Sequence, residues 1–187
     1  WAKVARRAIS LLQEQSIVSR DHIGVLGFGI GAQLAWMVAG TDKRVCAMCA
    51  VNGGGYRWAE HNARFLGSDI PSGDVQLAYS TGVGAETYAM FISCPTLAVV
   101  TSDSVQCDID RIGDMLDLVK SDVKQLIVSE SCDIQITNAA YRALILWLRA
   151  HLASNSPSIE PSMRFEATDG KLYVKINTAK KAEKRTL

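Results

Sequence analysis

The sequence predicts an α/β protein: a three-layer α/β/α sandwich around a parallel sheet, followed by a C-terminal β-hairpin. Helical and strand-like segments alternate over the first 153 residues, as a parallel sheet with right-handed crossovers requires. The strand-like segments are short, continuous apolar runs, which is typical of strands buried on both faces. Near the C-terminus, apolar and polar residues alternate on either side of Asp169-Gly170, the pattern of a β-hairpin.

The predicted helices have apolar residues at spacings of three and four. The first helix covers residues 2–16 and turns Val4, Ile9 and Leu12 to one side. The other predicted helices are residues 33–39, 109–119 and 138–153. We expect the helix of residues 33–39 to end at Gly40, because glycine is common just after a helix C-terminus.

Short apolar runs predict the strands of the sheet. These runs are residues 23–26, 45–51, 95–100 and 125–128. Residues 52–87 differ, because they are rich in glycine and aromatic residues and have no regular period. A long irregular segment inside a compact domain usually lines a site or forms a lid.

The composition divides the chain into three parts. Residues 1–153 form the predicted α/β domain, residues 154–161 read as a linker, and residues 162–187 form a hairpin or the start of a second β domain. An isolated two-stranded hairpin is marginally stable, so we expect this one to pack on the main body or to begin a further domain.

Charge and hydropathy exclude several classes of partner. The 20 Lys and Arg residues balance 19 acidic ones, and the only dense basic run lies at the C-terminal end, so we expect no nucleic-acid partner. No apolar run reaches the roughly 18 residues of a membrane span, and the N-terminus has no signal-peptide pattern. We therefore expect no membrane partner, while the compartment stays open. Trp1 reads as a point inside a longer gene product.

The cysteines are interpreted as small buried residues. Five of them, Cys46, Cys49, Cys94, Cys107 and Cys132, cannot all pair, and most lie in apolar surroundings. The spacing of Cys46 and Cys49 is that of a redox motif, but in a strand residues three apart point to opposite faces. No group of His, Cys and Asp residues has metal-ligand spacing, so we expect neither a metal nor a cofactor.

The glycine-rich stretch Gly27-Phe28-Gly29-Ile30-Gly31 follows the first apolar run and has two interpretations. In the first, Gly27, Gly29 and Ala32 form a G-x-G-x-x-A dinucleotide fingerprint. The acid expected about 20 residues further on is absent, because Asn52 stands near that position. In the second, the stretch is a nucleophile elbow, G-x-nucleophile-x-G, with Gly29 in the nucleophile's place. The backbone N–H of Ile30 would then be an oxyanion donor.

The surrounding sequence favours the second interpretation. The sequence resembles the centre of α/β-hydrolases of the acetyl xylan esterase and dienelactone hydrolase type. The resemblance lies in residues 5–12, 21–28 and 41–47, in Tyr88-Ala89 and in Ile92-Ser93-Cys94-Pro95-Thr96-Leu97. That group carries an "Asp-x-x-Arg-Ile-Gly-Val-x-Gly-x-Ser-x-Gly-Gly" elbow and an "Asp-x-Arg-Val-x-Ala" start to the next strand. The resemblance covers about residues 5–152, with gaps in the middle.

The resemblance implies a Ser-His-Asp triad that is not intact here. The nucleophile position holds Gly29. The acid position falls on Asp103, with Ser104 as the alternative, and the loop that should carry the histidine contains Ser131 but no histidine. The three histidines, His22, His61 and His151, lie elsewhere.

The sequence thus predicts a carbohydrate-esterase-like hydrolase that is inactive, a pseudoenzyme with a cleft for a glycan or acyl ester. We expect Phe28, Asn52, Tyr56, Trp58 and Asp103 to line this cleft. Two alternatives stay open: a subunit-interface module without a ligand, and a dinucleotide-binding oxidoreductase. The resemblance also implies strands before the elbow that this sequence lacks, so we expect a homo-oligomer or a partner chain to cover that sheet edge.

Overall fold

The computed structural model describes most of the predicted α/β domain and the backbone of the hairpin. The described residues are 1–55, 73–74, 81–104, 107–130, 135–153, 162–168 and 171–177. The chain divides into two compact units, Trp1–Ser154 and Asn155–Leu187. Three predicted site residues, Tyr56, Trp58 and Ser131, lie outside the described residues, as do His61 and Cys132.

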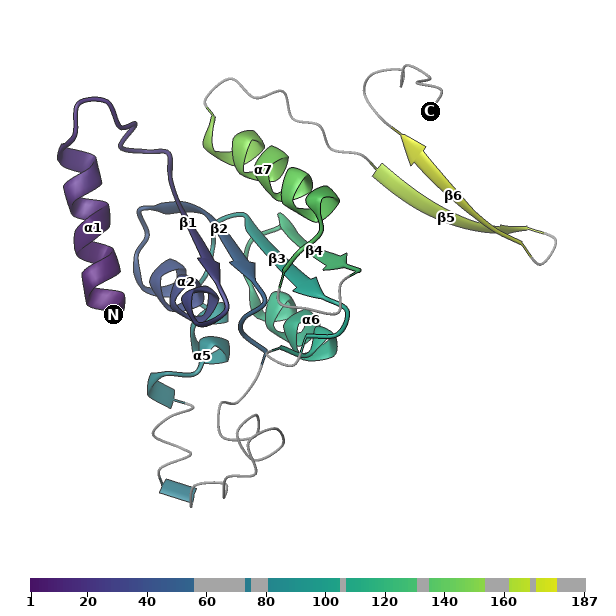
Figure 1. The fold of residues 1–187 in the computed structure, drawn as a ribbon, viewed down its shortest axis with the longest axis horizontal. Coiled ribbons are helices and arrows are strands. Elements are labelled where there is room, and N and C mark those ends of the chain that lie inside the picture. Colours follow the sequence, from purple (N-terminus) through teal and green to yellow (C-terminus); the bar gives the residue numbers. More distant parts are fainter. Residues whose placement is uncertain are drawn as a thin grey trace. The chain divides into compact units, whose positions relative to one another are not determined.

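A parallel sheet of four strands forms the centre of the first unit, in the order β1-β2-β3-β4 (Figure 1). The strands are β1 (Ile23–Phe28), β2 (Val45–Val51), β3 (Thr96–Thr101) and β4 (Lys124–Ser129). The two central strands, β2 and β3, are buried along almost their whole length, which explains their unbroken apolar sequences. The predicted parallel sheet is confirmed.

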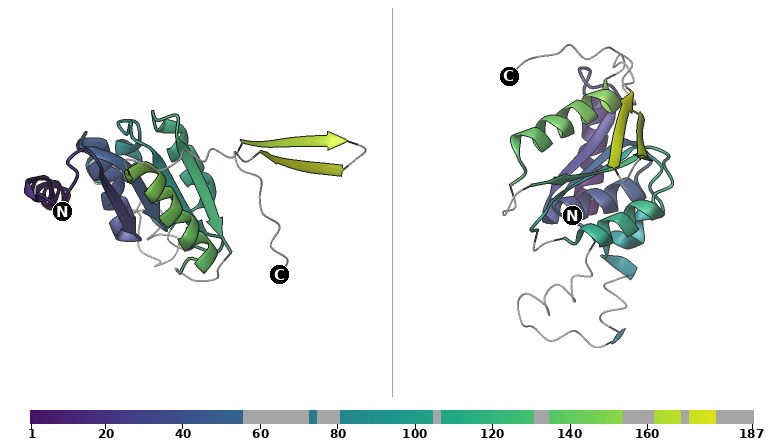
Figure 2. Two further views of the ribbon diagram at one scale, coloured as in Figure 1. Left: turned by 90° about the horizontal axis from the view of Figure 1, so that it is seen from above. Right: turned by 90° about the vertical axis from the view of Figure 1, so that its right-hand side faces the viewer.

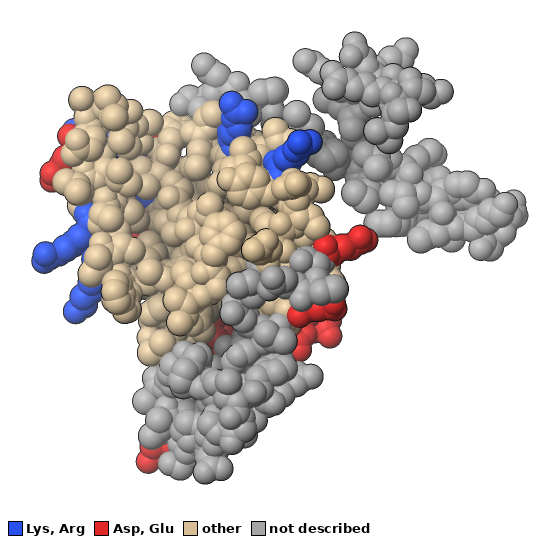
Figure 3. Space-filling view, viewed as in Figure 1, with Lys and Arg blue, Asp and Glu red and all other residues tan. Residues whose placement is uncertain are grey.

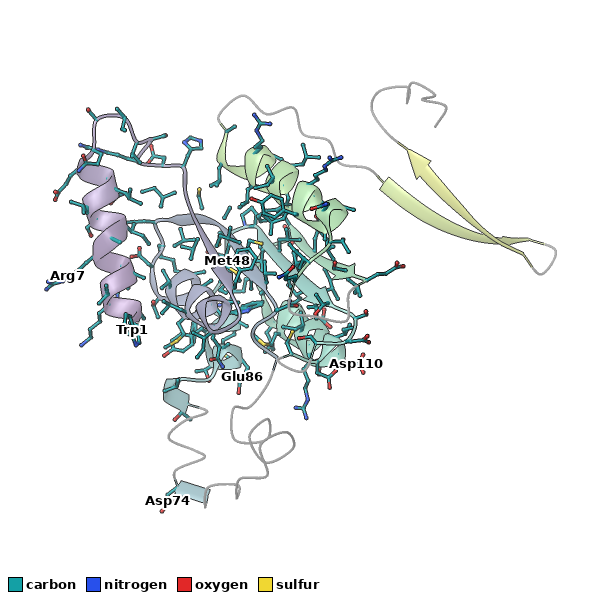
Figure 4. All side chains as sticks on the ribbon, viewed as in Figure 1. Trp1, Arg7, Met48, Asp74, Glu86 and Asp110 are labelled. Atoms are coloured by element: carbon teal, nitrogen blue, oxygen red, sulfur yellow. The ribbon has the colours of Figure 1, made fainter. Side chains whose placement is uncertain are left out.

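Helices cover both faces of this sheet, so the first unit has the three layers that the sequence predicts (Figure 2). The helices are α1 (Ala2–Glu14), α2 (Ile30–Thr41), α5 (Ala85–Ala89), α6 (Ile109–Leu118) and α7 (Asn138–Leu152). On one face α2, α5 and α6 pack over Met48, which is labelled in Figure 4. On the other face α7 packs Leu144 and Trp147 against Leu97.

Helix α2 differs from its prediction at both ends. It starts at Ile30, directly after the glycine turn, and it continues through Gly40 to Thr41. Gly40 is therefore not a C-terminal cap, and that expectation was wrong. A Cβ added at Gly40 would lie 2.6 Å from the carbonyl oxygen of Tyr88 in α5. The glycine thus allows two helices to approach closely, a tertiary cause that the local sequence does not reveal.

A buried carboxylate fixes the chain between α2 and β2 and ties α1 to it. Asp42 accepts from the guanidinium of Arg44 at 2.6 Å and from that of Arg6 at 3.4 Å. Arg44 also donates to Ser10 and to the backbone oxygen of Arg6. These bonds hold the pKa of Asp42 at about 2, below its usual 3.8, with the Arg44 side chain as the main cause.

The second unit contains an antiparallel hairpin of β5 (Ser162–Thr168) and β6 (Lys171–Asn177). The register pairs Ser162 with Asn177 at the open end and Thr168 with Lys171 at the turn. Over the described part of the chain, no helix has the length and apolar character needed to cross a membrane.

Candidate functional site

A sharp turn joins β1 to α2, and Gly29 is its central residue. Gly29 has φ 54° and ψ −118°, a conformation that glycine adopts readily and other residues adopt only with strain. Its N–H donates to the carbonyl oxygen of Val51 at 2.8 Å, and its own carbonyl accepts from Ala32 at 3.0 Å. The turn is therefore bonded both to β2 and to the first turn of α2.

The backbone packs tightly around this turn. A Cβ added to Gly27 would lie 2.0 Å from the carbonyl oxygen of Gly31, and one added to Gly53 would lie 2.1 Å from that of Gly29. By contrast, a Cβ added at Gly31 would meet no atom within 4 Å. Strand, sharp turn and helix, with backbone that leaves no room for a side chain at Gly27, are features of a nucleophile elbow.

A cleft of about 500 Å³ opens over the turn at the C-terminal edge of the sheet. The described residues that line it are Phe28, Gly29, Ile30, Val51, Asn52, Gln135 and Ile136. This edge is where ligands bind in open α/β sheets. None of these described lining residues has a charged, hydroxyl, thiol or imidazole side chain, so the cleft is suited to a neutral, largely apolar ligand.

Two of the predicted lining residues have very different surroundings. Phe28 is 50 % exposed at the rim of the cleft. Asn52 is only 3 % exposed, and its Oδ1 accepts from the backbone N–H of Thr101 at 2.8 Å. Phe28 is thus free to contact a ligand, whereas Asn52 connects the ends of β2 and β3.

The structure brings together only some of the predicted site residues. Phe28, Gly29, Ile30 and Asn52 share the cleft, but Asp103 is exposed beyond the end of β3 and is not among the described lining residues. Ser104 is also outside that set, and its hydroxyl lies 3.3 Å from the sulfur of Cys107. That Asp103 lines the cleft therefore stays a prediction.

Sequence reasoning missed three lining residues, Val51, Gln135 and Ile136. The last two come between β4 and α7, in the loop where the resemblance places the histidine. The C-terminal ends of parallel strands share one edge of a sheet. The position of Gln135 and Ile136 after a predicted strand was therefore the signal that could have identified these two residues.

Neither described histidine lies in the lining of the cleft. His22 Nδ1 is 2.8 Å from the hydroxyl of Ser19, just before β1 begins and at the opposite end of that strand from Gly29. His151 lies in the last turn of α7, where its ring contacts Trp147 with a centroid distance of 4.4 Å. Burial lowers the pKa of His151.

Acidic side chains gather on the part of the surface where α6 lies, and others lie near α1 and at the lower end of the view (Figure 3). On and before α6 these are Asp108, Asp110, Asp114 and Asp117. They do not converge with other ligands, since no group of three or more His, Cys, Asp or Glu residues that could hold a metal ion occurs among the described residues.

The sheet and the elbow resemble those of α/β-hydrolases, and the comparisons with known proteins find the same fold. Residues 6–64 match the family model described as "BAAT / Acyl-CoA thioester hydrolase C terminal". The acetyl xylan esterase from Paenibacillus sp. R4 is 16% identical, with a TM-score of 0.68 over 81% of this chain and 52% of its own. Acetyl xylan esterase 1 from Thermoanaerobacterium sp. JW/SL YS485 is 13% identical, with a TM-score of 0.64 over 82% of this chain and 52% of its own.

A third solved structure, of 2,6-dihydroxy-pseudo-oxynicotine hydrolase, is 18% identical, with a TM-score of 0.64 over 83% of this chain and 47% of its own. No curated protein matches the chain. The chain thus spans about half the length of these solved structures. The solved structures that share this fold thus include esterases.

Proposed function

We propose that this chain is an α/β-hydrolase-like module that binds a neutral acyl ester in the cleft over Gly29 without hydrolysing it efficiently. The position of Gly29 carries this proposal. It occupies the turn where an elbow presents its nucleophile, in a backbone conformation fixed by the bond to Val51, and glycine supplies no attacking atom.

The remaining features of the turn support binding. The first N–H groups of a helix have no partner within the helix, and α2 begins at Ile30 beside the cleft. An ester carbonyl oxygen placed here would accept from the Ile30 N–H and lie in the favourable field of the helix N-terminus. The acyl chain would contact Phe28 and Ile136. A glycan stacked on Phe28 is the alternative ligand.

Ligand binding is tested by thermal unfolding with phenyl butyrate as the ester probe and xylobiose as the glycan probe. We expect phenyl butyrate to raise the melting temperature in a saturable way and Phe28→Asp to abolish this shift. Tyr141→Asp is the matched control, because Tyr141 is 51 % exposed and lies outside the described lining. Equal shifts in wild type and Phe28→Asp would contradict the proposed cleft, and a shift with xylobiose alone would assign it to a glycan.

Hydrolysis is tested with p-nitrophenyl acetate. We expect wild type to show no turnover above buffer. We expect Gly29→Ser to stay close to the Gly29→Ala background, because the described lining offers no base to take the hydroxyl proton. A positioned general base contributes roughly 10² to 10⁴, so an enhancement above about 10⁴ in Gly29→Ser would show that a base is present. Turnover by wild type that is lost in Asp103→Ala would contradict the inactive assignment.

A second candidate function is assembly through the edge of β1, and one observation favours it. β1 is the terminal strand of the four-stranded sheet, and Leu26 on it is 41 % exposed. The strand carries neither charge nor proline, the usual protections of an edge. If this edge joins subunits, sedimentation will show a dimer that Leu26→Lys dissociates and Leu146→Lys, on the exposed side of α7, does not.

The dinucleotide-binding alternative has less support, because its ribose-binding acid is replaced by the buried Asn52. A saturable rise in melting temperature on adding NAD or NADP would favour it.

A further inference from the structure

One cysteine lies at the start of β2 and another just before β3, at the edge of the sheet opposite the cleft. The parallel register pairs Met48 with Thr96, and the Met48 N–H donates to the carbonyl oxygen of Pro95 at 2.9 Å. Cys46 comes two residues before Met48, and Cys94 comes two residues before Thr96. Neighbouring strands lie about 4.8 Å apart, and a disulfide needs a Cα separation of about 4.4–6.8 Å. Extended by two residues toward the start of each strand, this register would place Cys46 beside Cys94, within the range for a disulfide.

The electrostatics of the two thiols give independent support for their proximity. Burial is the main cause that raises the pKa of Cys94 to about 11, and the charge of a Cys46 thiolate raises it further. The cation of Lys43 acts on Cys94 in the opposite direction. Lys43 Nζ donates to the carbonyl oxygen of Phe91 at 2.8 Å, so the amine is anchored near this edge of the sheet.

A local irregularity gives Cys46 freedom to turn toward Cys94. β1 and β2 pair Ile23 with Val45 and then Gly24 with Ala47, so Cys46 is an extra residue of β2 with no partner in β1. Such a bulge bends the strand and changes the direction of a side chain. Cys46 therefore has more freedom than a residue held in a regular ladder.

The two thiols also differ in access. Cys46 is partly exposed, whereas Cys94 is only 9 % exposed and belongs to the core cluster on the α2 side of the sheet. Cys49 lies in the core of the other face, and Cys107 is buried near Ser104. Of the described cysteines, Cys46 is thus the one that a small oxidant can reach first. Burial raises the pKa of its thiol as well as that of Cys94, so both thiolates form mainly at alkaline pH and oxidation at neutral pH should be slow.

We propose that Cys46 and Cys94 are a redox-active pair, which hydrogen peroxide oxidises to an intramolecular disulfide. In the first step the Cys46 thiolate attacks one peroxide oxygen, an S–O bond forms, the O–O bond breaks, and hydroxide leaves to be protonated to water. In the second step the Cys94 thiolate attacks the sulfur of the Cys46 sulfenic acid, an S–S bond forms, and the S–O bond breaks with loss of a second water. Two thiols are oxidised, and one peroxide is reduced to two waters.

The disulfide would connect the starts of β2 and β3 and close the loop of chain between them. That loop contains Asn52 at the cleft and continues through residues 56–72, whose structure is not described. Closing a long loop restricts the unfolded chain. The oxidised protein should therefore melt several degrees higher than the reduced protein.

Mass spectrometry of the whole chain tests the proposal. After treatment with hydrogen peroxide at alkaline pH, where the thiolates form, we expect wild type to lose the mass of two hydrogen atoms, and a non-reducing digest to yield one peptide pair joined through Cys46 and Cys94. Cys46→Ala and Cys94→Ala should abolish the pair, whereas Cys132→Ala, the matched control, should retain it. The digest of wild type identifies the linkage even where a variant folds poorly.

Three outcomes would overturn the proposal. One is a disulfide that joins a different pair of cysteines. Another is loss of two hydrogens that persists in the Cys46→Ala variant. The third is oxidation of Cys46 that stops at the sulfinic acid in wild type with Cys94 still reduced, since it would mean that the second thiol is out of reach.

Discussion

The Oδ1 atom of Asn52 accepts a 2.8 Å hydrogen bond from the backbone N–H of Thr101, and the hydroxyl of Thr101 lies 3.3 Å from the same oxygen. Asn52 directly follows β2 and has a left-handed backbone, at φ 50°, which asparagine tolerates better than most residues. Its N–H donates to Val99 at 2.9 Å. One residue therefore joins two strand ends directly below the cleft.

Removing the Asn52 side chain should destabilise the first unit. Asn52→Ala leaves the buried N–H of Thr101 without its acceptor, which costs about 1–3 kcal/mol. Asn52→Gly loses the same bond but removes the cost of the left-handed backbone, about 1–2 kcal/mol, so it should be less destabilised than Asn52→Ala. Urea unfolding of the two variants measures the difference, and equal midpoints would argue against backbone strain at this position.

Substitution of alanine for Gly27 and for Gly31 should change the stability of the first unit by different amounts. Gly27→Ala forces a Cβ to within 2.0 Å of the Gly31 carbonyl oxygen, and the backbone shift needed should cost several kcal/mol, as overpacking does. Gly31→Ala meets open space inside α2 and should be neutral or stabilising by up to about 1 kcal/mol. Thermal unfolding compares them. Similar melting temperatures would mean that the turn is not packed as described.

The pKa of Asp42 predicts a loss of stability in acid. Because its pKa falls from 3.8 to about 2 on folding, its contribution is present above pH 3.8 and is lost as the pH falls toward 2. We expect about 1–2 kcal/mol, less than the full shift implies, since Arg6 and Arg44 are partly exposed. Free energies of unfolding at pH 6 and pH 2.5 test this, and the difference between them should be smaller in Asp42→Asn by the contribution of Asp42.

Cys49 should be unreactive in the folded protein. Burial raises the pKa of its thiol to about 12, and the thiolate is the reactive form. At pH 8 iodoacetamide should leave Cys49 unlabelled until guanidinium unfolds the chain. The raised pKa stabilises the fold below about pH 9, and this contribution disappears as the pH rises through 12. Rapid labelling of Cys49 without denaturant would indicate that β2 opens locally.

Much of the fold follows from local sequence, and the exceptions have tertiary causes. The prediction for residues 45–51 agrees with β2 at both ends, because a strand buried on both faces must be apolar throughout. The five-residue helix α5 was missed because it is too short to show a helical period. Helix α2 begins three residues earlier than predicted, since Gly31 reads as loop but lies within the first turn of α2.

The candidate site was predicted only in part for a similar reason. Gly29, Ile30 and Phe28 belong to one continuous motif, which the sequence displays directly. Gln135 and Ile136 reach the cleft only because four parallel strands bring their ends to one edge. Asp103 follows a strand at that same edge but is exposed and outside the described lining. Position at or after the C-terminal end of a strand is thus common to the lining residues, but it does not by itself bring a residue into the site.

The conformation of Gly29 depends on backbone bonds to Val51 and Ala32 and on no side chain of its own. The geometry for catalysis and the reacting atom are therefore separable in this architecture. Substitution at this single position would change the chemical group that the turn presents while the backbone bonds that shape the turn remain.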